Sequence, residues 1–454
     1  MHATLSRRQL LWGASASAAL AVAQPLRVWA QAAPAGTKRA DAGRLVVVML
    51  RGAYDGISAL VPYADAHYYN SRPTIAIAAP DGSAQTALKL DNTFALHPAL
   101  APLLPLWQQG VLSVVPAAGL PAPNRSHFSA QYEMEIAQGG KSSATSGWLN
   151  KLAEIERAGN SASAMGVGEA NPAILAGDAA VRLIARGQSA GRTGVLANEN
   201  TRRALMDLYA GQDALSEAFR QGASSRMQSA QELISEKMAA ENRRDAAMLD
   251  TPRNMNNKLD RDGTPASAQA QSEQMAAASN GAADPVGLQL DAQHLGTLMR
   301  NDRALRLGFL SAGGWDTHAN QGHVTGQLAS NLGNLGRGIA QLRQDFSEPD
   351  DVIVVMSEFG RTARENGTRG TDHGYGNALW LVGNRINGGR WHGQWSGLAL
   401  GNLNEARDLP AHQDYRAVLA QVLRATFFMP DSALASVLPG AKWDTRLDSL
   451  IRKG

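Results

Sequence analysis

Two short segments of the chain each place an aspartate close to a histidine just beyond an apolar run. The first, with the sequence GGWDTH, carries Asp316 and His318, and the second, TDHG, carries Asp372 and His373. Carboxylate and imidazole groups are good ligands for divalent cations. If the two loops meet in space, they could hold a metal ion for hydrolysis. For the first pair, a carboxylate that only orients the imidazole is the alternative.

A third aspartate, Asp55, lies in a glycine-flanked turn after the apolar run Leu45–Leu50. Glycine allows unusual dihedral angles and a close approach of the backbone to a ligand. Asp55 is therefore a candidate metal ligand. Aspartate is also common in turns, where it caps the segment that follows, and both interpretations stay open.

A candidate nucleophile, Ser126, stands beside Arg125 at the expected start of a helix, Ser126–Ala137. The positive end of a helix favours an anion, and a base or metal can activate a serine hydroxyl. Arg125 could pair with an oxygen of a phosphate or sulfate group. Serine is also a preferred N-cap residue, so a purely structural role is the alternative.

The elements that must position these residues alternate between apolar runs and helical stretches. The runs predicted as strands are Leu45–Leu50, Val111–Val115, Ala173–Ala176, Leu305–Leu310, Val352–Met356 and Ala378–Val382. The predicted helices are Pro98–Gln108, Ser126–Ala137, Thr201–Tyr209, Thr325–Phe346 and Asp414–Phe427. This alternation predicts an α/β fold with a doubly wound, mostly parallel sheet and helices on both faces. Ligands of such sheets bind beyond the carboxyl ends of the strands.

A single domain is expected over residues 44–450, with an insertion at residues 221–284. The insertion is rich in Ala, Gln, Ser, Asn and Met and has few large aliphatic residues. Ser224–Arg243 could form an amphipathic helix, whereas Asp250–Asp284 has the composition of a flexible loop or a disordered insertion.

Residues 1–30 are predicted to be a twin-arginine export signal. Arg7 and Arg8 precede the apolar, alanine-rich stretch Leu10–Ala23 and small residues suited to cleavage. A stable membrane span needs about 20 apolar residues, so no stable membrane anchor is expected. We therefore expect the twin-arginine export machinery as a partner and a periplasmic or secreted location.

The composition excludes several classes of protein. The chain has no cysteine, which excludes a disulfide framework, thiolate metal sites and thiol nucleophiles. The formal net charge is +3 at pH 7, and no basic run is interleaved with aromatic residues. Nucleic acid is therefore not expected as a partner.

Taken in order, several motifs resemble those of domain-of-unknown-function family 1501, sulfatase-like exported proteins of the alkaline phosphatase superfamily. The motifs are Arg51–Gly56, Asn124–Phe128, Gly313–His318, Ser357–Arg361, Thr371–Gly376 and Asp414–Arg416. The resemblance spans about residues 44–438. It implies an alkaline phosphatase-like α/β fold with a site for one or two divalent ions (zinc, manganese, magnesium or calcium).

The resemblance also implies roles for individual residues. Ser126 stands where the nucleophile is expected, and Arg125 would stabilise charge on the ester oxygens. The metal ligands would be Asp55, Asp372 and His373 for one ion and Asp316 and His318 for the other.

The chain departs from the superfamily pattern at one ligand position. Asn320 stands where a histidine is common, four residues after Asp316. A late histidine ligand is also usual, and His392 and His412 are the remaining candidates.

Two functions of different classes follow from these residues. The first is an exported, metal-dependent hydrolase that cleaves a phosphate or sulfate ester of a small anionic substrate through a serine nucleophile. The alternative is a non-catalytic family member that binds a ligand or partner in the cell envelope. A purely structural protein would explain the apolar runs but not the two Asp–His loops. Metal content and the role of Ser126 discriminate between the first two.

Overall fold

The computed structural model describes residues 43–139, 144–157, 162–190, 196, 198–247 and 266–452, which belong to one compact unit, residues 43–454. The export signal predicted for residues 1–30 lies outside the described residues. Part of the predicted insertion, residues 248–265, also lies outside them.

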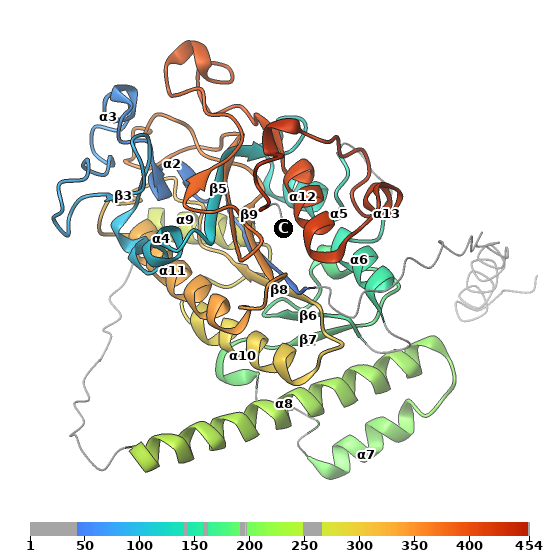
Figure 1. Cartoon of the computed structure of the whole chain (residues 1–454). Coiled ribbons are helices and arrows are strands. Elements are labelled where there is room, and N and C mark those ends of the chain that lie inside the picture. The colour runs from blue at the N-terminus through green and yellow to red at the C-terminus, as the bar shows by residue number, and fades with distance from the viewer. Residues whose placement is uncertain are drawn as a thin grey trace, which may run out of the picture. The chain divides into compact units, whose positions relative to one another are not determined.

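A nine-stranded, mostly parallel sheet forms the centre of this unit (Figure 1). Its order is β11 (Arg390–Trp391), β5 (Leu112–Gly119), β10 (Asn377–Gly383), β9 (Val352–Ser357), β1 (Leu45–Leu50), β8 (Leu307–Ala312), β6 (Ala164–Val167) and β7 (Val181–Ile184), with β12 (Gln413–Asp414) beside β5. Of these described strands, β10 alone runs antiparallel to its neighbours. All six residues of β1 are buried between β8 and β9, which explains its uninterrupted apolar sequence.

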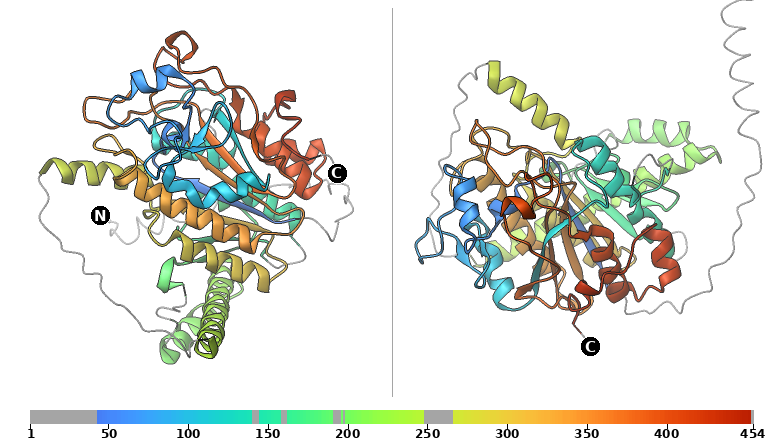
Figure 2. Two further views of the ribbon diagram at one scale, coloured as in Figure 1. Left: turned by 60° about the vertical axis from the view of Figure 1, so that its left-hand side comes forward. Right: turned by 90° about the horizontal axis from the view of Figure 1, so that it is seen from above.

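Helices cover both faces of the sheet, so the chain has the α/β fold that its sequence predicts (Figures 1 and 2). One face carries η1 (Pro98–Leu103), α4 (Leu104–Gln108), α10 (Leu288–Asn301) and α11 (Gln327–Asp345). The other carries α5 (His127–Ile136), α6 (Trp148–Glu156), α12 (Tyr415–Phe427) and α13 (Asp431–Val437). The side chains of Val46 and Val48 pack into the first layer with Leu335 of α11.

Shorter elements complete the unit. Three of them form a small antiparallel sheet in the order β2 (Leu60–Val61), β4 (Ala95–Leu96) and β3 (Leu88–Lys89). The others are α2 (Gly56–Ala59), α3 (Ala66–Ser71), η2 (Ala173–Leu175), η3 (Gly187–Ser189), η5 (Leu400–Asn402) and η6 (Thr445–Leu447).

Five of the six predicted strands are present, with ends shifted by a few residues. The prediction for Ala173–Ala176 is wrong, because Ala173–Leu175 is the 3-10 turn η2, between Pro172 and Gly177. A run of four apolar residues does not distinguish a buried turn from a strand. The predicted helices are also present, although Pro98–Gln108 divides into η1 and α4.

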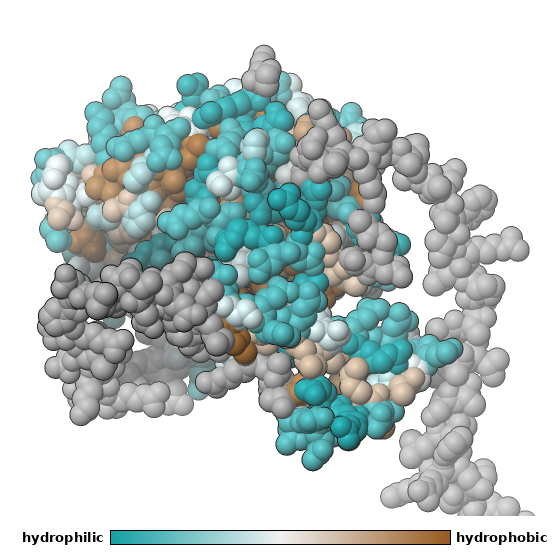
Figure 3. All heavy atoms as spheres, turned by 60° about the horizontal axis from the view of Figure 1, so that its bottom comes forward, coloured by the Kyte–Doolittle hydropathy of each residue, from teal (hydrophilic) through white to brown (hydrophobic). Residues whose placement is uncertain are grey.

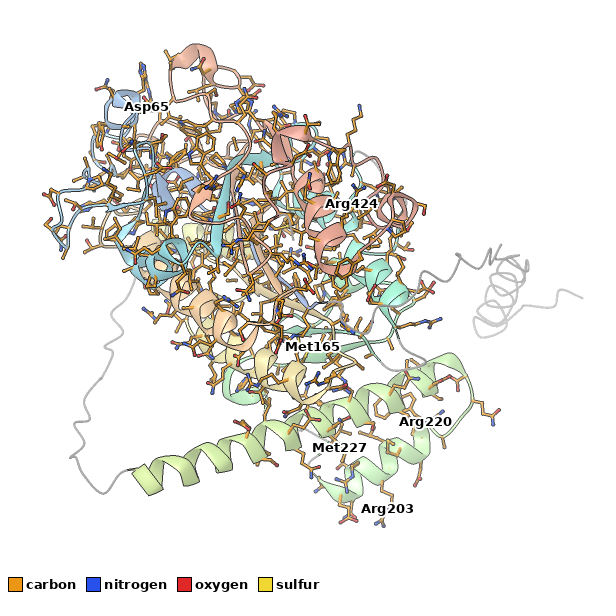
Figure 4. The ribbon with its side chains drawn as sticks, in the orientation of Figure 1. Asp65, Met165, Arg203, Arg220, Met227 and Arg424 are labelled. Carbon is orange, nitrogen blue, oxygen red and sulfur yellow. The ribbon has the colours of Figure 1, made fainter. Side chains whose placement is uncertain are left out.

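The insertion is largely helical where the structure describes it. α7 (Glu199–Leu208) precedes α8 (Ala214–Ala247), which contains the expected helix Ser224–Arg243. Figure 4 shows the side chains of Arg203, Arg220 and Met227 on this pair of helices. Within the predicted loop Asp250–Asp284, residues Ala266–Ser279 form α9. This part is therefore a helix and not a loop.

On the face drawn in Figure 3, hydrophilic side chains predominate over scattered apolar ones. No helix among the described residues is both long enough and apolar enough to cross a bilayer. α8 has the length, but it carries charged residues such as Glu217, Arg220 and Glu232.

Candidate metal centre

The carboxyl ends of parallel strands bring the predicted loops together. β1, β5, β8 and β9 run in the same direction, so the loops that follow them lie at one edge of the sheet. Asp316 follows β8, Glu358 and His373 follow β9, and α5 begins after β5 with His127. The loops therefore meet at the edge where a doubly wound sheet is expected to place its ligand site.

His127, Asp316 and His373 form a compact cluster at this edge, with their ligand atoms all within 4.8 Å of one another. The Oδ1 atom of Asp316 lies 3.4 Å from Nε2 of His127 and 3.2 Å from Nε2 of His373. The two Nε2 atoms are 2.9 Å apart. Ligand atoms around a tetrahedral ion with bonds of about 2.1 Å are roughly 3.4 Å apart. These separations therefore fit a shared metal ion.

His318 adjoins the cluster on the side of His373. Its Nε2 atom lies 3.0 Å from Oδ1 of Asp316 and 3.0 Å from Nε2 of His373. About a quarter of its side chain is exposed. His318 is therefore a candidate fourth donor at the solvent side of the cluster.

Hydrogen bonds at the far side of each imidazole fix its tautomer. Nδ1 of His127 lies 2.8 Å from the carboxylate of Glu358. Nδ1 of His318 lies 3.1 Å from the carboxylate of Asp372. Nδ1 of His373 lies 2.9 Å from the carbonyl of Arg125. Because each partner is an acceptor, each Nδ1 carries a proton and a neutral ring presents its lone pair at Nε2. Such outer hydrogen bonds orient metal-binding histidines.

The charge of the cluster also suits a cation. Asp316 Oδ1 accepts a hydrogen bond of 2.5 Å from the buried Arg361, whereas Oδ2 is buried and has no partner among the described residues. With neutral histidines, the carboxylates of Asp316, Glu358 and Asp372 outnumber the guanidinium groups of Arg361 and Arg407 that act on them. A cation would offset the excess negative charge and could bind the unpartnered oxygen, which is otherwise costly to bury.

The pKa values show where the cluster holds a proton. Burial opposes the charged form of His127, but hydrogen bonds with Asp316 and Glu358 outweigh burial and raise its pKa to about 9. Burial alone would raise the pKa of Asp316, yet hydrogen bonds with the three histidines hold it far below its ordinary range. Burial lowers the pKa of His373. In the protein alone, a proton therefore binds to His127 while His373 is neutral.

Arg361 ties the surrounding loops together. It is fully buried and donates hydrogen bonds to backbone carbonyls as well as to Asp316. The carbonyls, at 2.6 to 3.1 Å, are those of Gly52, Ala53, Trp315 and Thr371. One side chain thus fixes the loops after β1, β8 and β9 relative to one another.

Strained backbone also gathers in these loops. Ala53, Asn320 and Arg369 adopt left-handed conformations, with φ of 56°, 46° and 57°. This conformation costs a residue other than glycine about 1 kcal/mol or more and is concentrated at functional sites. The surrounding hydrogen bonds, including that from the Asn320 N–H to the carbonyl of Thr368 at 2.9 Å, hold the loops in place.

Asp55, one of the predicted ligands, lies outside the cluster. Both of its oxygens pair with the buried Arg72, at 2.6 and 3.0 Å, and it also accepts hydrogen bonds from Ser58 and Gln321, each at 2.7 Å. Gln321 in turn accepts a hydrogen bond from Thr317 at 3.1 Å. Asp55 therefore anchors the loop that carries Asp316 but does not join its ligand atoms.

Asp372 is the second predicted ligand that lies outside the cluster. Its Oδ1 atom accepts hydrogen bonds from His318 and, at 3.0 Å, from Asn366. Half of its side chain is exposed. Asp372 thus lies behind His318 and orients its ring, a role that the sequence did not indicate for this residue.

Ser126 stands at the N-cap of α5 but makes no side-chain cap hydrogen bond. Its side chain is exposed. Ser126 therefore takes the N-cap position through its backbone, and its hydroxyl does not cap the helix. His127, the next residue, reaches into the cluster.

Arg125 contacts the cluster through its backbone. Its carbonyl accepts the hydrogen bond from Nδ1 of His373. Its side chain pairs through Nη2 with Glu405 at 2.9 Å and Asp408 at 3.1 Å, while Nε is buried without a partner among the described residues.

Comparisons with known proteins place the chain in a family. Residues 42–434 match the family described as "Protein of unknown function (DUF1501)". The chain belongs to this family. No curated protein matches the chain. Among solved structures, a magnesium-bound mutant of TAB5 alkaline phosphatase is similar over 85% of this chain and 98% of its own, with 9% identity and a TM-score of 0.31.

The late histidines of this DUF1501 protein are engaged elsewhere. Nε2 of His392 lies 2.8 Å from the carbonyl of Asn387, and Nε2 of His412 lies 2.9 Å from the hydroxyl of Ser396. Neither belongs to the candidate metal group among the described residues.

The DUF1501 motif Asp414–Arg416 lines a separate cavity of about 460 Å³. Within it, Arg416 donates a hydrogen bond of 2.6 Å to Asp414 and one of 2.7 Å to the carbonyl of Pro439. The guanidinium is thus already engaged in holding the C-terminal segment on α12, and no member of the metal cluster lines this cavity.

The sequence interpretation missed one member of the cluster, His127, and Glu358, the carboxylate that binds its outer nitrogen. His127 lies in the motif Asn124–Phe128, but only the adjacent Ser126 was given a role there, as the candidate nucleophile. Glu358 follows β9 directly and accepts hydrogen bonds from the Gly52 N–H at 2.8 Å and from Gln131 at 2.9 Å as well as from His127. A polar residue directly after a buried strand was the available signal for Glu358.

Proposed function

We propose that this protein binds a divalent metal ion through His127, Asp316 and His373, with His318 as a fourth donor, and uses it for hydrolysis. The observation that carries the proposal is the convergence of imidazole lone pairs on a buried carboxylate that has an unpartnered oxygen. Without a proton or cation between them, these groups would repel one another.

The donor set narrows the choice of ion. Imidazole nitrogen with carboxylate oxygen suits zinc and other transition metals. Magnesium and calcium prefer sites made of oxygen ligands. Of the ions considered from sequence, zinc fits these residues best, and manganese is the next candidate.

We further propose a phosphate or sulfate ester as the substrate and Ser126 as the nucleophile. A bound divalent ion would stabilise negative charge on an attacking or departing oxygen. Ser126 is exposed, free of a cap hydrogen bond and adjacent to His127. About a quarter of the Arg125 side chain is exposed, so its guanidinium would be the group that contacts an ester oxygen.

Metal analysis of the purified protein tests the metal site. We expect about one equivalent of zinc after loading and dialysis, and loss of this ion in His373→Ala. His412→Ala is the matched control, since it removes an imidazole outside the cluster. Less than about a tenth of an equivalent in the unaltered protein, after loading with zinc, manganese, magnesium or calcium, would contradict the proposal.

Turnover of an aryl phosphate or aryl sulfate by the loaded protein tests the hydrolase. Metal binding without turnover of either ester class would favour the alternative, a non-catalytic protein that binds a ligand or partner in the cell envelope.

We also propose export by the twin-arginine machinery to the periplasm or the medium. The proposal rests on Arg7 and Arg8 before the apolar stretch Leu10–Ala23. The double variant Arg7→Lys, Arg8→Lys is expected to stay in the cytoplasm on cell fractionation. Unchanged export of the variant would contradict this route.

A further inference from the structure

The carboxyl end of α9 contacts the loop that carries Asp316. The hydroxyl of Ser279 accepts a hydrogen bond of 3.0 Å from the N–H of Gly314, and the carbonyl of Ala283 accepts one of 2.7 Å from the N–H of Gly313. Asp316 lies two residues beyond Gly314. The insertion therefore reaches back to the metal centre.

The peptide groups of Gly314 are held from two sides. Ser279 binds the N–H, and Asn331 of α11 donates a hydrogen bond of 2.7 Å to the carbonyl. Ser279 donates its own proton to the carbonyl of Met275 at 2.7 Å, so its oxygen is oriented to accept from Gly314. α9 thereby fixes the start of the loop against the core helix α11.

A second chain of hydrogen bonds runs from α9 to His127. The carbonyl of Ala278 accepts a hydrogen bond of 2.8 Å from Nε2 of Gln131, which also donates to Glu358 at 2.9 Å. Glu358 binds Nδ1 of His127. The amide of Gln131 has a defined orientation, because its oxygen accepts from Nη1 of Arg51 at 3.0 Å.

The contact between α9 and the loop leaves no space for another atom. A Cβ atom on Gly313 would lie 2.5 Å from Oγ of Ser279 and 2.7 Å from the carbonyl oxygen of Ala282. The absence of a side chain at Gly313 is therefore what permits the approach.

We propose that the carboxyl end of α9 is a positioning element for two metal ligands, so that this end of the insertion controls how tightly the ion is held. Ser279 acts on the loop of Asp316, and Ala278 acts on His127 through Gln131 and Glu358. The inference rests on the proposed metal-binding function and adds a role for the insertion. Outer partners of metal ligands typically contribute tenfold to a hundredfold to affinity.

The test compares two serine-to-alanine substitutions on the same helix. Ser279→Ala removes the acceptor of the Gly314 N–H, whereas Ser272→Ala alters an exposed position of α9. We expect the zinc dissociation constant, measured by chelator competition, to rise at least about tenfold in Ser279→Ala and to stay unchanged in Ser272→Ala. Gly313→Ala, which would push α9 from the loop, is expected to weaken binding as well.

Hydrogen exchange of the unaltered protein gives a second measurement that does not depend on how a variant folds. Coupling between two sites is reciprocal, so zinc should slow amide exchange over residues 272–284. Equal zinc affinity in Ser279→Ala and Ser272→Ala, or exchange in this segment that zinc does not alter, would overturn the inference while leaving the metal site intact. Failure of the unaltered protein to bind any ion would overturn both.

Discussion

The Nε2 atoms of His127 and His373 lie 2.9 Å apart, although each ring directs its Nδ1 proton to another acceptor. In these tautomers, two neutral rings point their lone pairs at each other and at the carboxylate of Asp316. A proton on His127 relieves this repulsion in the protein alone, which agrees with its pKa of about 9. An ion at the same place must displace that proton.

Zinc affinity is therefore expected to rise with pH up to about 9. His127 is protonated below its raised pKa of about 9, whereas the ion binds the neutral ring. Because the ion must displace this proton, the zinc affinity should fall about tenfold for each pH unit below that value. Titration calorimetry in buffers of different ionisation enthalpy counts the protons released at neutral pH. Release of no proton, with affinity independent of pH below 9, would show that His127 is not displaced.

The sequence predicted the edge of the sheet at which the site lies, because apolar runs identify β1, β8 and β9. It did not predict which acids contact the ligand atoms. Asp316 and Asp372 occur in similar Asp–His segments, yet one lies inside the cluster and the other binds the outer nitrogen of His318. That difference depends on how two loops fold over each other, which local spacing does not encode.

Asp55 is a second aspartate whose role could not be predicted from local sequence. Its glycine-flanked turn suited a ligand equally well, and its partner Arg72 lies 17 residues later in a segment without a recognisable motif. Long-range pairing of this kind becomes visible only in the folded chain. His127 was not predicted as a ligand for a related reason. It has no aspartate close to it in the sequence, so no ligand spacing marks it.

Asp55→Asn is expected to destabilise the protein without removing its metal. The change leaves the fully buried guanidinium of Arg72 without its charged partner, and such a loss typically costs about 3–5 kcal/mol. Urea unfolding measures this cost, and Asp178→Asn at an exposed position is the control. A loss of bound zinc with unchanged stability would restore Asp55 as a ligand.

The stability difference between the unaltered protein and Asp55→Asn should shrink in acid. Burial would raise the pKa of Asp55, but the charge of Arg72 outweighs it and lowers the pKa. A carboxyl whose pKa is lowered on folding stabilises the fold above its unfolded pKa of about 3.9 and loses this contribution as pH falls through its folded value. Urea unfolding of both proteins, measured from neutral pH to below pH ~4, gives the difference in their free energies of unfolding at each pH.

Ser126→Ala is expected to abolish ester hydrolysis while leaving stability and zinc content unchanged. The hydroxyl is exposed and makes no cap hydrogen bond, so its removal should alter the free energy of unfolding by less than about 0.5 kcal/mol. Turnover of an aryl phosphate and an aryl sulfate provides the measurement. Ser129→Ala, one turn into α5, is the control, and full activity in Ser126→Ala would exclude this serine as nucleophile.

Glu358→Gln isolates the contribution of one buried charge to the metal centre. Oε1 of Glu358 accepts hydrogen bonds from His127, Gln131 and Gly52. The amide oxygen of a glutamine has two lone pairs, so it can still accept from Nδ1 of His127. The variant therefore keeps the position of His127 but loses the negative charge that makes its imidazole a stronger ligand. Zinc affinity should fall about tenfold or more.

The same substitution should move the pH dependence of zinc binding to lower pH. Glu358 is among the groups that raise the pKa of His127 to about 9, so its neutral replacement should bring this pKa closer to the ordinary value of about 6.5. Zinc titrations at several pH values measure both effects. Glu365→Gln is the matched control, because Glu365 binds Thr74 and does not contact the histidines. An affinity and pH midpoint equal to those of the unaltered protein would mean that the charge of Glu358 does not act on the ion through His127.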